Sequence, residues 1–459
     1  MENITIEACA AEGKALTHWN GVVVFVPFAV PGDVVDIRVT KKSKNYYEGF
    51  VERIVTPSKD RLEPFCQHFG VCGGCKWQPL PYPMQLEAKR QQVYDQLVRI
   101  GHLNVPEIRP TIPSDKIQYY RNKLEFTFSS KRWLLKDEDI ESVPENDRMG
   151  LGFHVGKFFD KVLDIKHCYL QKDPSNDIRL FIKKYAVENG LDFFDIRQNV
   201  GYVRNMFIRT TDTGDLMVIM CFFYENREDR EKMLDAIAEA FPQITSLYYI
   251  INNKLNDSIG DQECILYKGE PTIRETMESL TFRIGPKSFY QTNSEQAYKL
   301  YSVARDFAEL TGNEIVYDLY TGTGTIAQFV SGKAARVIGI EYVPEAIEDA
   351  KVNAAGNGIT NCEFFAGDMK DVLSRDFINE HGQPDVIILD PPRAGIHPDV
   401  AKVILEASPA RMVYVSCNPA SQARDLALFA DKYEITAVQP VDMFPHTQHV
   451  ENVCALRLR

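Results

Sequence analysis

Two kinds of cysteine in this chain could do chemistry. Cys417 stands alone, directly after the apolar run 412–416. Three others lie close together in one short stretch, at Cys66, Cys72 and Cys75. A single cysteine on a strand is more often a packing residue, but ligands bind where the strands of an α/β sheet end. Cys417 is therefore a candidate nucleophile, and the clustered cysteines are candidate metal ligands.

A glycine-containing loop, 320–325, follows the predicted strand 314–319. Its glycines fit either a dinucleotide or S-adenosylmethionine, so the loop alone leaves a dehydrogenase open. Asp318 lies four residues before Gly322, where a carboxylate suits the methionine ammonium and is poorly placed beside a pyrophosphate. Glu341 ends the next predicted strand and could accept hydrogen bonds from ribose hydroxyls. With Asp368 and Asp390 after later strands, these features resemble the S-adenosylmethionine-dependent methyltransferase fold.

A methyltransferase of this kind needs a cysteine only for some acceptors. Nitrogen and oxygen already carry a lone pair, whereas carbon 5 of a pyrimidine must first be made nucleophilic. A thiolate that adds to C6 gives C5 enolate character, and a base must later remove the C5 proton. Cys417 and Asp390 are expected to face one crevice. Glu451 is the candidate base, although a single acid at that place could also be a surface residue.

The complete set of motifs resembles the RNA (uracil-5-)methyltransferase family, close to its iron–sulfur-containing bacterial 23S ribosomal RNA members. The matching segments are 288–293, 318–324, 389–393, 415–419 and 449–451. The resemblance implies that Cys417 is the nucleophile and Glu451 the base. It also implies a cofactor site lined by Gln291, Tyr320, Glu341, Asp368 and Asp390. The signature 120–123 (Tyr-Arg-Asn-Lys) is expected to contact RNA or support a flipped nucleotide, because a stacked uracil cannot present C5 and C6 to opposite partners.

The cysteine cluster needs a fourth ligand. On spacing alone, a Cys-x-x-Cys pair is more typical of zinc or of redox chemistry. The family resemblance implies that Cys168 joins Cys66, Cys72 and Cys75 as the four thiolates of a 4Fe–4S cluster. Zinc stays the alternative, while the three-cysteine spacing of a radical enzyme is missing from the sequence. We expect a structural cluster that ties the loop near residue 70 to the middle of the chain.

Three domains are predicted to position these residues. Residues 1–57 hold four apolar runs separated by turns, which predict a small β-barrel of the OB-like kind, resembling the TRAM module. Residues 58–271 mix strands and helices and predict an α+β central domain that carries the cluster loop. Residues 272–459 alternate strand with helix, which predicts an α/β, doubly wound, Rossmann-like parallel sheet.

The composition restricts the partners. With 459 residues, 44% of them hydrophobic and 25% charged, the chain is expected to fold as several globular domains. A net charge of −12 argues against coating RNA by bulk attraction. The basic and aromatic segments 41–47 and 116–133 could still bind RNA locally, or form ordinary solvated faces of a sheet. No apolar run reaches the ~20 residues that cross a bilayer, so we expect no membrane partner. The acidic N-terminus does not resemble a signal peptide, so we expect a cytoplasmic protein. We also expect a monomer.

The leading hypothesis is S-adenosylmethionine-dependent methylation of C5 of a uridine in structured RNA, with 23S ribosomal RNA as the first expected substrate. The same chemistry on transfer RNA is the runner-up. A non-catalytic RNA-binding factor is the alternative from another class, and the presence of Cys417 and Glu451 argues against it. A cytosine-5 enzyme is disfavoured because the motifs around these two residues match the uracil group.

Overall fold

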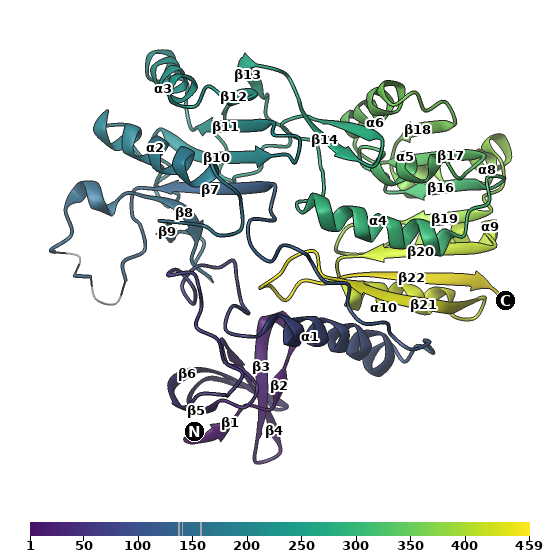
Figure 1. Cartoon of the computed structure of the whole chain (residues 1–459), viewed down its shortest axis with the longest axis horizontal. Helices are drawn as coiled ribbons and strands as arrows, with labels where there is room; N and C mark the ends of the chain where they lie inside the picture. Colours follow the sequence, from purple (N-terminus) through teal and green to yellow (C-terminus); the bar gives the residue numbers. More distant parts are fainter. Residues whose placement is uncertain (136–137, 140, 157) are drawn as a thin grey trace.

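The computed structural model describes residues 1–135, 138–139, 141–156 and 158–459. An N-terminal sheet, a central sheet with helices on it, and a C-terminal sheet follow one another along the chain (Figure 1). Helix α1 lies between the N-terminal sheet and the C-terminal part. Among the described residues, no helix is long and apolar enough to span a membrane.

The N-terminal part is a sheet in the order β1-β5-β6-β4-β3-β2. Alternate residues such as Val24, Val26 and Val35 are fully buried and form its small core, as expected for strands with one wet face. The four predicted runs correspond to β1, β4, β5 and β6, whereas β2 and β3 were not predicted. Its elements are β1 (Ile4–Thr5), β2 (Ala8–Cys9), η1 (Ala11–Gly13), β3 (Lys14–Trp19), β4 (Val22–Pro27), β5 (Val34–Lys42) and β6 (Tyr46–Thr56).

The central part is built on a sheet in the order β13-β12-β11-β10-β7-β8-β9. The strands β10 and β11 are buried along their whole length. Helices α2 and α3 cover one face of the sheet, and residues of the C-terminal part pack on the other. Its elements are β7 (Lys123–Ser129), η3 (Glu145–Arg148), β8 (Gly150–His154), β9 (Val162–Asp164), α2 (Ser175–Glu188), β10 (Val203–Thr210), β11 (Leu216–Phe222), α3 (Arg227–Ala240), β12 (Ser246–Ile251) and β13 (Ile265–Gly269).

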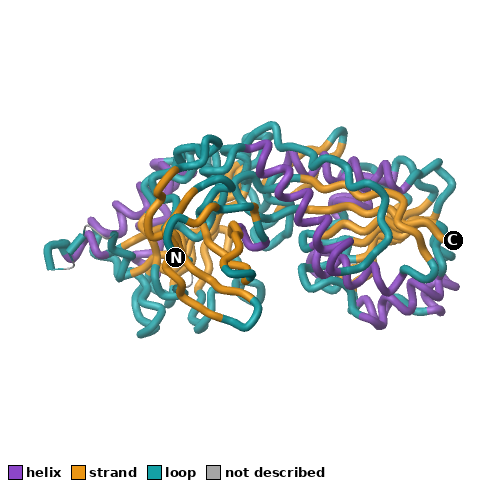
Figure 2. Tube along the Cα trace, turned by 90° about the horizontal axis from the view of Figure 1, so that it is seen from below, coloured by secondary structure: helices purple, strands orange, loops and turns teal. Residues whose placement is uncertain are grey.

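The C-terminal part begins with a hairpin, β14 (Ile273–Met277) and β15 (Leu280–Ile284), and helix α4 (Ser294–Ala308). A sheet in the order β18-β17-β16-β19-β20-β22-β21 follows, and Figure 2 shows helices on both of its sides. Its strands are β16 (Ile315–Leu319), β17 (Arg336–Glu341), β18 (Cys362–Ala366), β19 (Val386–Leu389), β20 (Arg411–Ser416), β21 (Tyr433–Val441) and β22 (Glu451–Leu458). Its helices are α5 (Thr325–Ser331), α6 (Pro344–Gly356), α7 (Met369–Val372), α8 (Arg375–His381), α9 (Pro398–Ala407) and α10 (Pro419–Phe429).

The C-terminal sheet has the predicted Rossmann-like, doubly wound architecture, but it is not parallel throughout. The pairs from β18 to β20 are parallel, whereas β22 pairs antiparallel with both β20 and β21. The chain reaches β22 by a direct return from β21, without the crossover helix that a parallel neighbour requires. This return places Glu451, the first residue of β22, at the end of the sheet where β20 ends.

Helix α1 (Tyr82–Tyr94) and the π-helical turn η2 (Asp95–Ile100) follow the cysteine-rich stretch and pack on the C-terminal part. Val93 and Leu97 are fully buried in the same apolar cluster as residues of β19, β20 and α10. The segment before the central sheet is therefore part of the core beneath the C-terminal sheet. The domain boundaries at 57/58 and 271/272 stay predictions.

Candidate active site and cysteine cavity

A cavity of about 1340 Å³ lies where β16, β17, β19 and β20 end. These strands end at neighbouring places because they run parallel in one sheet, which is where ligands bind in such folds. The cavity brings together six of the site residues expected from the sequence, namely Gln291, Tyr320, Glu341, Asp390, Cys417 and Glu451.

Cys417 follows β20 at a fixed turn into α10. The side chain of Asn418 caps that helix by accepting a hydrogen bond from the backbone N–H of Ala420, at 3.2 Å. Burial raises the pKa of the Cys417 thiol to about 11, and nearby Glu451 and Asp390 contribute to the rise. Arg393 acts in the opposite direction. In the ligand-free protein Cys417 is therefore a protonated thiol near neutral pH.

Glu451 begins β22, opposite Val441 on β21, and its side chain is buried. Burial raises the pKa of its carboxyl well above the usual value, and the neighbouring Asp390 raises it further. Arg393 lowers the pKa of Glu451 as it does that of Cys417. The same guanidinium thus favours the charged forms of both groups, which the chemistry of a nucleophile and a base requires.

Asp318 is the second-to-last residue of β16 and is fully buried. Its Oδ2 accepts hydrogen bonds from Thr321 Oγ1 at 2.5 Å and from the N–H of Ala327 at 3.0 Å. Its Oδ1 has no hydrogen-bond partner among the described residues, although it is buried. Burial raises the pKa of this carboxyl to about 7. An ammonium group beside Oδ1 would satisfy the unpaired oxygen and stabilise the ionised form.

Glu341 ends β17 with both carboxylate oxygens held by backbone N–H groups. Oε2 accepts from Gly322 at 3.1 Å and Oε1 from Val343 at 3.0 Å. The loop that donates one of these bonds requires glycine at position 324, where φ is +75° and an added Cβ would lie 2.9 Å from Phe364. The carboxylate keeps lone pairs that can accept from vicinal hydroxyls. Glu341 lines the large cavity and fits the ribose of S-adenosylmethionine, whereas Asp318 is fully buried and does not itself line the cavity.

Asp368 lies apart from the other predicted cofactor residues. It caps the short helix α7, where its side chain accepts a hydrogen bond from the N–H of Lys370 at 3.2 Å. It lines a separate cavity of about 230 Å³, and Tyr320 and Tyr342 line both this cavity and the large one. The structure therefore places Asp368 beyond the two tyrosines, outside the group that it brings together.

Several cavity residues were not assigned a role from the sequence. Phe444 and His449 come from the loop before Glu451. Because they lie so close to the candidate base in the sequence, their place at the cavity could have been predicted. Arg121, which belongs to the 120–123 signature expected to contact RNA or support a flipped nucleotide, also lines the cavity, and only the fold shows that it does. Its neighbour Asn122 donates hydrogen bonds to the Gln291 carbonyl and to Ser294 Oγ, both at 2.9 Å.

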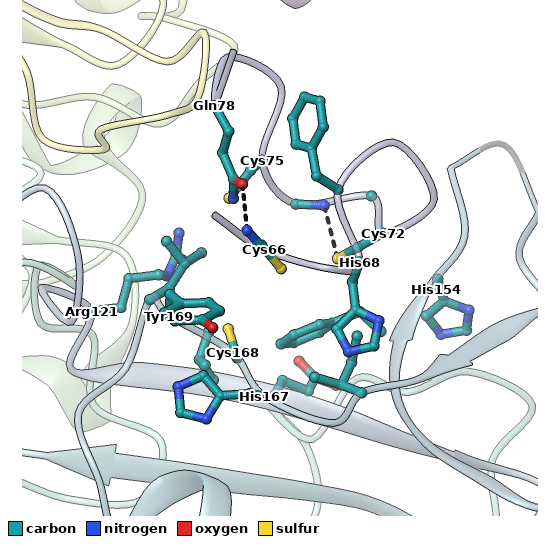
Figure 3. Close-up of a pocket in the computed structure, with 18 of the residues that line it drawn as sticks. Cys66, His68, Cys72, Cys75, Gln78, Arg121, His154, His167, Cys168 and Tyr169 are labelled. Carbon is teal, nitrogen blue, oxygen red and sulfur yellow. Dashed lines mark hydrogen bonds between the residues drawn. The ribbon is translucent and has the colours of Figure 1, made fainter. Parts of the chain in front are cut away.

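A second cavity, of about 550 Å³, is lined by all four cysteines expected to bind a cluster (Figure 3): Cys66, Cys72, Cys75 and Cys168. Cys66, Cys72 and Cys75 come from the loop before α1, and Cys168 from the segment after β9. His68 joins these segments, because its Nε2 accepts a hydrogen bond from the N–H of Lys166 at 2.8 Å.

Backbone hydrogen bonds hold the first and last of these cysteines in place. Gln78 Oε1 accepts from the N–H of Cys66 at 3.2 Å, and Asn176 Oδ1 accepts from that of Cys168 at 2.8 Å. Burial raises the thiol pKa of all four cysteines. Among the described residues, no group of three or more histidine, cysteine or acidic side chains is arranged to hold a metal ion.

The fold and the large cavity define a class, the S-adenosylmethionine-dependent methyltransferases. Similarity to known proteins narrows it. The profile of the tRNA (Uracil-5-)-methyltransferase family matches residues 207–459, and that of the TRAM domain matches residues 2–51. The chain belongs to the tRNA (uracil-5-)-methyltransferase family.

Related proteins cover the whole chain. An "Uncharacterized RNA methyltransferase" of Porphyromonas gingivalis is 59% identical over 455 residues, which are 97% of this chain and 98% of that protein. A protein of the same description from Bacteroides thetaiotaomicron is 58% identical, over 98% of this chain and 100% of the relative. The crystal structure of Pyrococcus abyssi tRNA (uracil-54, C5)-methyltransferase with S-adenosyl-L-homocysteine superposes with a TM-score of 0.76 at 28% identity, covering 99% of this chain and 100% of that one.

Proposed function

We propose that this protein methylates C5 of a uridine in structured RNA, with Cys417 as nucleophile and Glu451 as base. The observation that carries the proposal is the shared cavity, in which a thiol and a buried carboxyl lie with Arg393 and the acids of a methyl-donor site. S-adenosylmethionine enters as the second substrate, its ammonium at Asp318 and its ribose at Glu341. Gln291, Tyr320 and Asp390 line the rest of that site.

The reaction balances with these two side chains. The Cys417 thiolate forms a bond to C6 of uracil, and the electron pair moves to give an enolate at C5. C5 then takes the methyl group from the sulfonium, whose carbon–sulfur bond breaks and leaves S-adenosylhomocysteine. The Glu451 carboxylate removes the remaining C5 proton, and the Cys417–C6 bond breaks to return the thiolate.

Both groups act in their ionised forms, and burial raises the pKa of each. The positive charge of a bound sulfonium, added to that of Arg393, lowers both pKa values. Binding of the methyl donor therefore favours the charged forms that the reaction uses. Asp318 and Asp390, whose pKa values burial raises to about 7, ionise for the same reason.

RNA reaches the cavity through its open side, where Phe289 is 66% exposed. A flipped base needs a flat apolar partner and a nearby cation for its phosphate. Phe289 and Arg121 supply these groups at the cavity wall. In the 120–123 signature we assign RNA contact to Arg121, since Asn122 is used to hold the Gln291 backbone.

The substrate we propose first is 23S ribosomal RNA, because the cysteine set resembles that of the ribosomal members. Transfer RNA is the second candidate. It is favoured by the full-length structural likeness to an archaeal enzyme whose name specifies uracil 54 of tRNA. Methylation of either RNA requires the same chemistry at the large cavity. The choice between them therefore depends on the protein surface that binds RNA outside this cavity.

We further propose that the second cavity binds a 4Fe–4S cluster through Cys66, Cys72, Cys75 and Cys168. Four cysteine thiolates are the usual donor set for this cluster, and all four line one cavity of about 550 Å³. Zinc is the alternative occupant for the same four thiolates. The cluster would join the cysteine loop to the central sheet and take no part in the methyl transfer.

The test is methylation of RNA that lacks 5-methyluridine, using anaerobically purified protein and S-adenosylmethionine. Nucleoside mass spectrometry of separate 23S and transfer RNA fractions reports the product and its substrate class. We expect 5-methyluridine with the wild type and none with Cys417→Ala. A methylated base other than 5-methyluridine would contradict the proposal. Iron and acid-labile sulfide in the protein, lost on changing Cys168→Ser, test the cluster separately.

A further inference from the structure

The loop 442–450 joins β21 to β22 and carries two residues that line the large cavity. Phe444 and His449 belong to it, and Glu451 follows it directly. Its two ends are fixed, because Val441 and Glu451 pair across the sheet. The position of the Glu451 carboxyl therefore depends on what holds the middle of this loop.

The middle of the loop is held by residues that follow the cysteine motif. The N–H groups of Lys76 and Trp77 both donate to the carbonyl of His446, at 2.8 and 3.0 Å. Gln85, fully buried on α1, accepts from the N–H of His446 at 2.8 Å, and its amide lies 3.2 Å from the His446 ring. The same amide donates to the carbonyls of Trp77 and Leu80 at 3.0 and 2.8 Å. One side chain thus binds the loop and its support together.

A buried ion pair holds the start of the same loop. Lys89, one turn after Gln85 on α1, lies 2.5 Å from Asp442, and both side chains are completely buried. Lys89 also donates to the Phe444 carbonyl at 3.1 Å, and Tyr82 donates to the other Asp442 oxygen at 2.9 Å. Burying an ion pair costs desolvation energy, but a pair completed by further hydrogen bonds can impose one geometry. The hydrogen bonds from Lys89 to the Phe444 carbonyl and from Tyr82 to Asp442 complete this pair.

We propose that Gln85 and Lys89 are positioning residues that hold the 442–450 loop so that Glu451 can remove the C5 proton. The inference rests on the proposed function. Neither residue lines the large cavity, so each acts through the loop and not on the substrates. Cys417 is carried by β20 and α10, which do not include this loop. Loosening the loop should therefore leave addition and methyl transfer intact and slow the later proton removal.

The order of the steps gives a signature that a general loss of structure cannot produce. If the proton stays on C5 after methyl transfer, the bond from Cys417 to C6 cannot break. The RNA then remains covalently attached to the protein and survives denaturing electrophoresis. Only folded protein that binds both substrates can form this adduct, so its accumulation also shows that the variant is folded.

The test compares Gln85→Leu and Lys89→Met with Gln91→Leu, a control on the exposed side of α1. Each protein receives unmodified RNA and S-adenosylmethionine, and kcat, KM for both substrates and the adduct fraction are measured. For Gln85→Leu we expect kcat to fall about 10²-fold, the cost of misplacing a reacting group by about 1 Å. KM for both substrates should stay within about twofold of the wild type, and the covalent adduct should accumulate. We expect the same result for Lys89→Met. Gln91→Leu should match the wild type.

Three results would overturn the proposal: unchanged kcat in folded Gln85→Leu and Lys89→Met, a fall in kcat without adduct, or a rise in KM for RNA alone. Glu451→Gln separates this failure from failure of the proposed function. If Glu451→Gln accumulates adduct and the two α1 variants do not, the positioning role is wrong and the mechanism stands. If Glu451→Gln itself gives no adduct, the assignment of Glu451 as the base is wrong.

Discussion

The two cavities place the same kind of side chain, a cysteine thiol, in different surroundings. In the large cavity the thiol of Cys417 lies with the carboxyls of Asp390 and Glu451, and Cys264 lines another part of the wall. In the smaller one four thiols line the wall together. Burial raises the thiol pKa in both places. Under the proposed function, what favours the thiolate differs: the positive charges of the methyl donor and Arg393 in the large cavity, and a bound metal in the smaller one.

The cavities are also neighbours, since Arg121 and Thr292 line both. The Arg121 guanidinium lies 5.3 Å from the ring centre of Phe444, a residue of the loop before Glu451. A change in the cysteine cavity can therefore reach the active site through a single layer of side chains. We therefore predict that variants of Cys417 lose the methylation reaction, whereas variants of the four clustered cysteines lose stability and keep most of the activity.

The largest effect is expected from Cys417→Ala. Without the thiolate no enolate forms at C5, so methylation should fall below detection, while binding of S-adenosylmethionine should be unchanged. Product is measured by nucleoside mass spectrometry and binding by calorimetry. Cys454→Ala, at a buried cysteine on the neighbouring strand, is the matched control and should stay active. Residual methylation by Cys417→Ala would show that the thiol in the large cavity is not the nucleophile.

Glu451→Gln should lower kcat by about 10²- to 10⁴-fold, the usual contribution of a positioned base. The amide cannot take the C5 proton, so RNA should stay attached at Cys417. A gel under denaturing conditions measures the attached fraction, and single-turnover kinetics measure methyl transfer. If the RNA is released at the normal rate, another group is the base.

Asp318→Asn should weaken S-adenosylmethionine by about 10- to 100-fold, because a charge-assisted hydrogen bond contributes about 1.5–3 kcal/mol. The buried unpaired Oδ1 is the expected contact of the ammonium group. Calorimetric titration gives the dissociation constant. Asp368→Asn, in the separate cavity beyond Tyr320 and Tyr342, should have a smaller effect. The reverse order would show that Asp368 is the more important cofactor contact.

Binding of S-adenosylmethionine should strengthen as pH rises through about 7. Burial raises the pKa of Asp318 to about 7 in the free protein. Its ionised form is the one that pairs with ammonium, so below that pH binding must first remove a proton. Between about pH 8 and about pH 6 the affinity should fall about tenfold, since each pH unit below a pKa costs a factor of ten. Affinity that is flat over this range would contradict the assignment. Asp318→Asn should keep only the part of the dependence that Asp390 contributes, because burial raises the pKa of Asp390 to about 7 as well.

The smallest effect on chemistry is expected from Cys168→Ser. Loss of one ligand should release iron and lower the unfolding temperature, because the cysteine loop loses its tie to the central sheet. We expect kcat to change little, because the proposed cluster takes no part in the methyl transfer. Iron content, a thermal melt and kcat are measured on one preparation. Loss of kcat as complete as in Cys417→Ala would show that the smaller cavity takes part in the reaction.

The sequence predicted well what depends on local pattern. The strands that end at Leu319, Glu341 and Leu389 are rich in apolar residues, and Tyr320, Glu341 and Asp390 at their ends line the large cavity. Strand β3 (Lys14–Trp19) was missed because its buried positions include Ala15 and Thr17, which give little apolar signal. The antiparallel β22 was missed because a direct return cannot be distinguished from a crossover by apolar runs alone.

Interactions between distant segments could not be predicted in this way. Lys89 and Asp442 are separated by 353 residues, and nothing in either local pattern indicates a buried ion pair. Lysine on a helix is usually exposed, so Lys89 is indistinguishable from a surface residue until the fold is known. For the same reason Arg121 could be linked to RNA from its signature, but its place between two cavities could not.

The most direct test of the central claim uses RNA in which the target uridine is replaced by 5-fluorouridine. Glu451 can remove a proton from C5 but not a fluorine, so after methyl transfer the bond between Cys417 and C6 should persist. With S-adenosylmethionine present, we predict a denaturation-resistant protein–RNA adduct whose digested peptide carries the modified nucleotide on Cys417. An adduct on another residue, or none from protein shown to bind both substrates, would contradict the covalent mechanism.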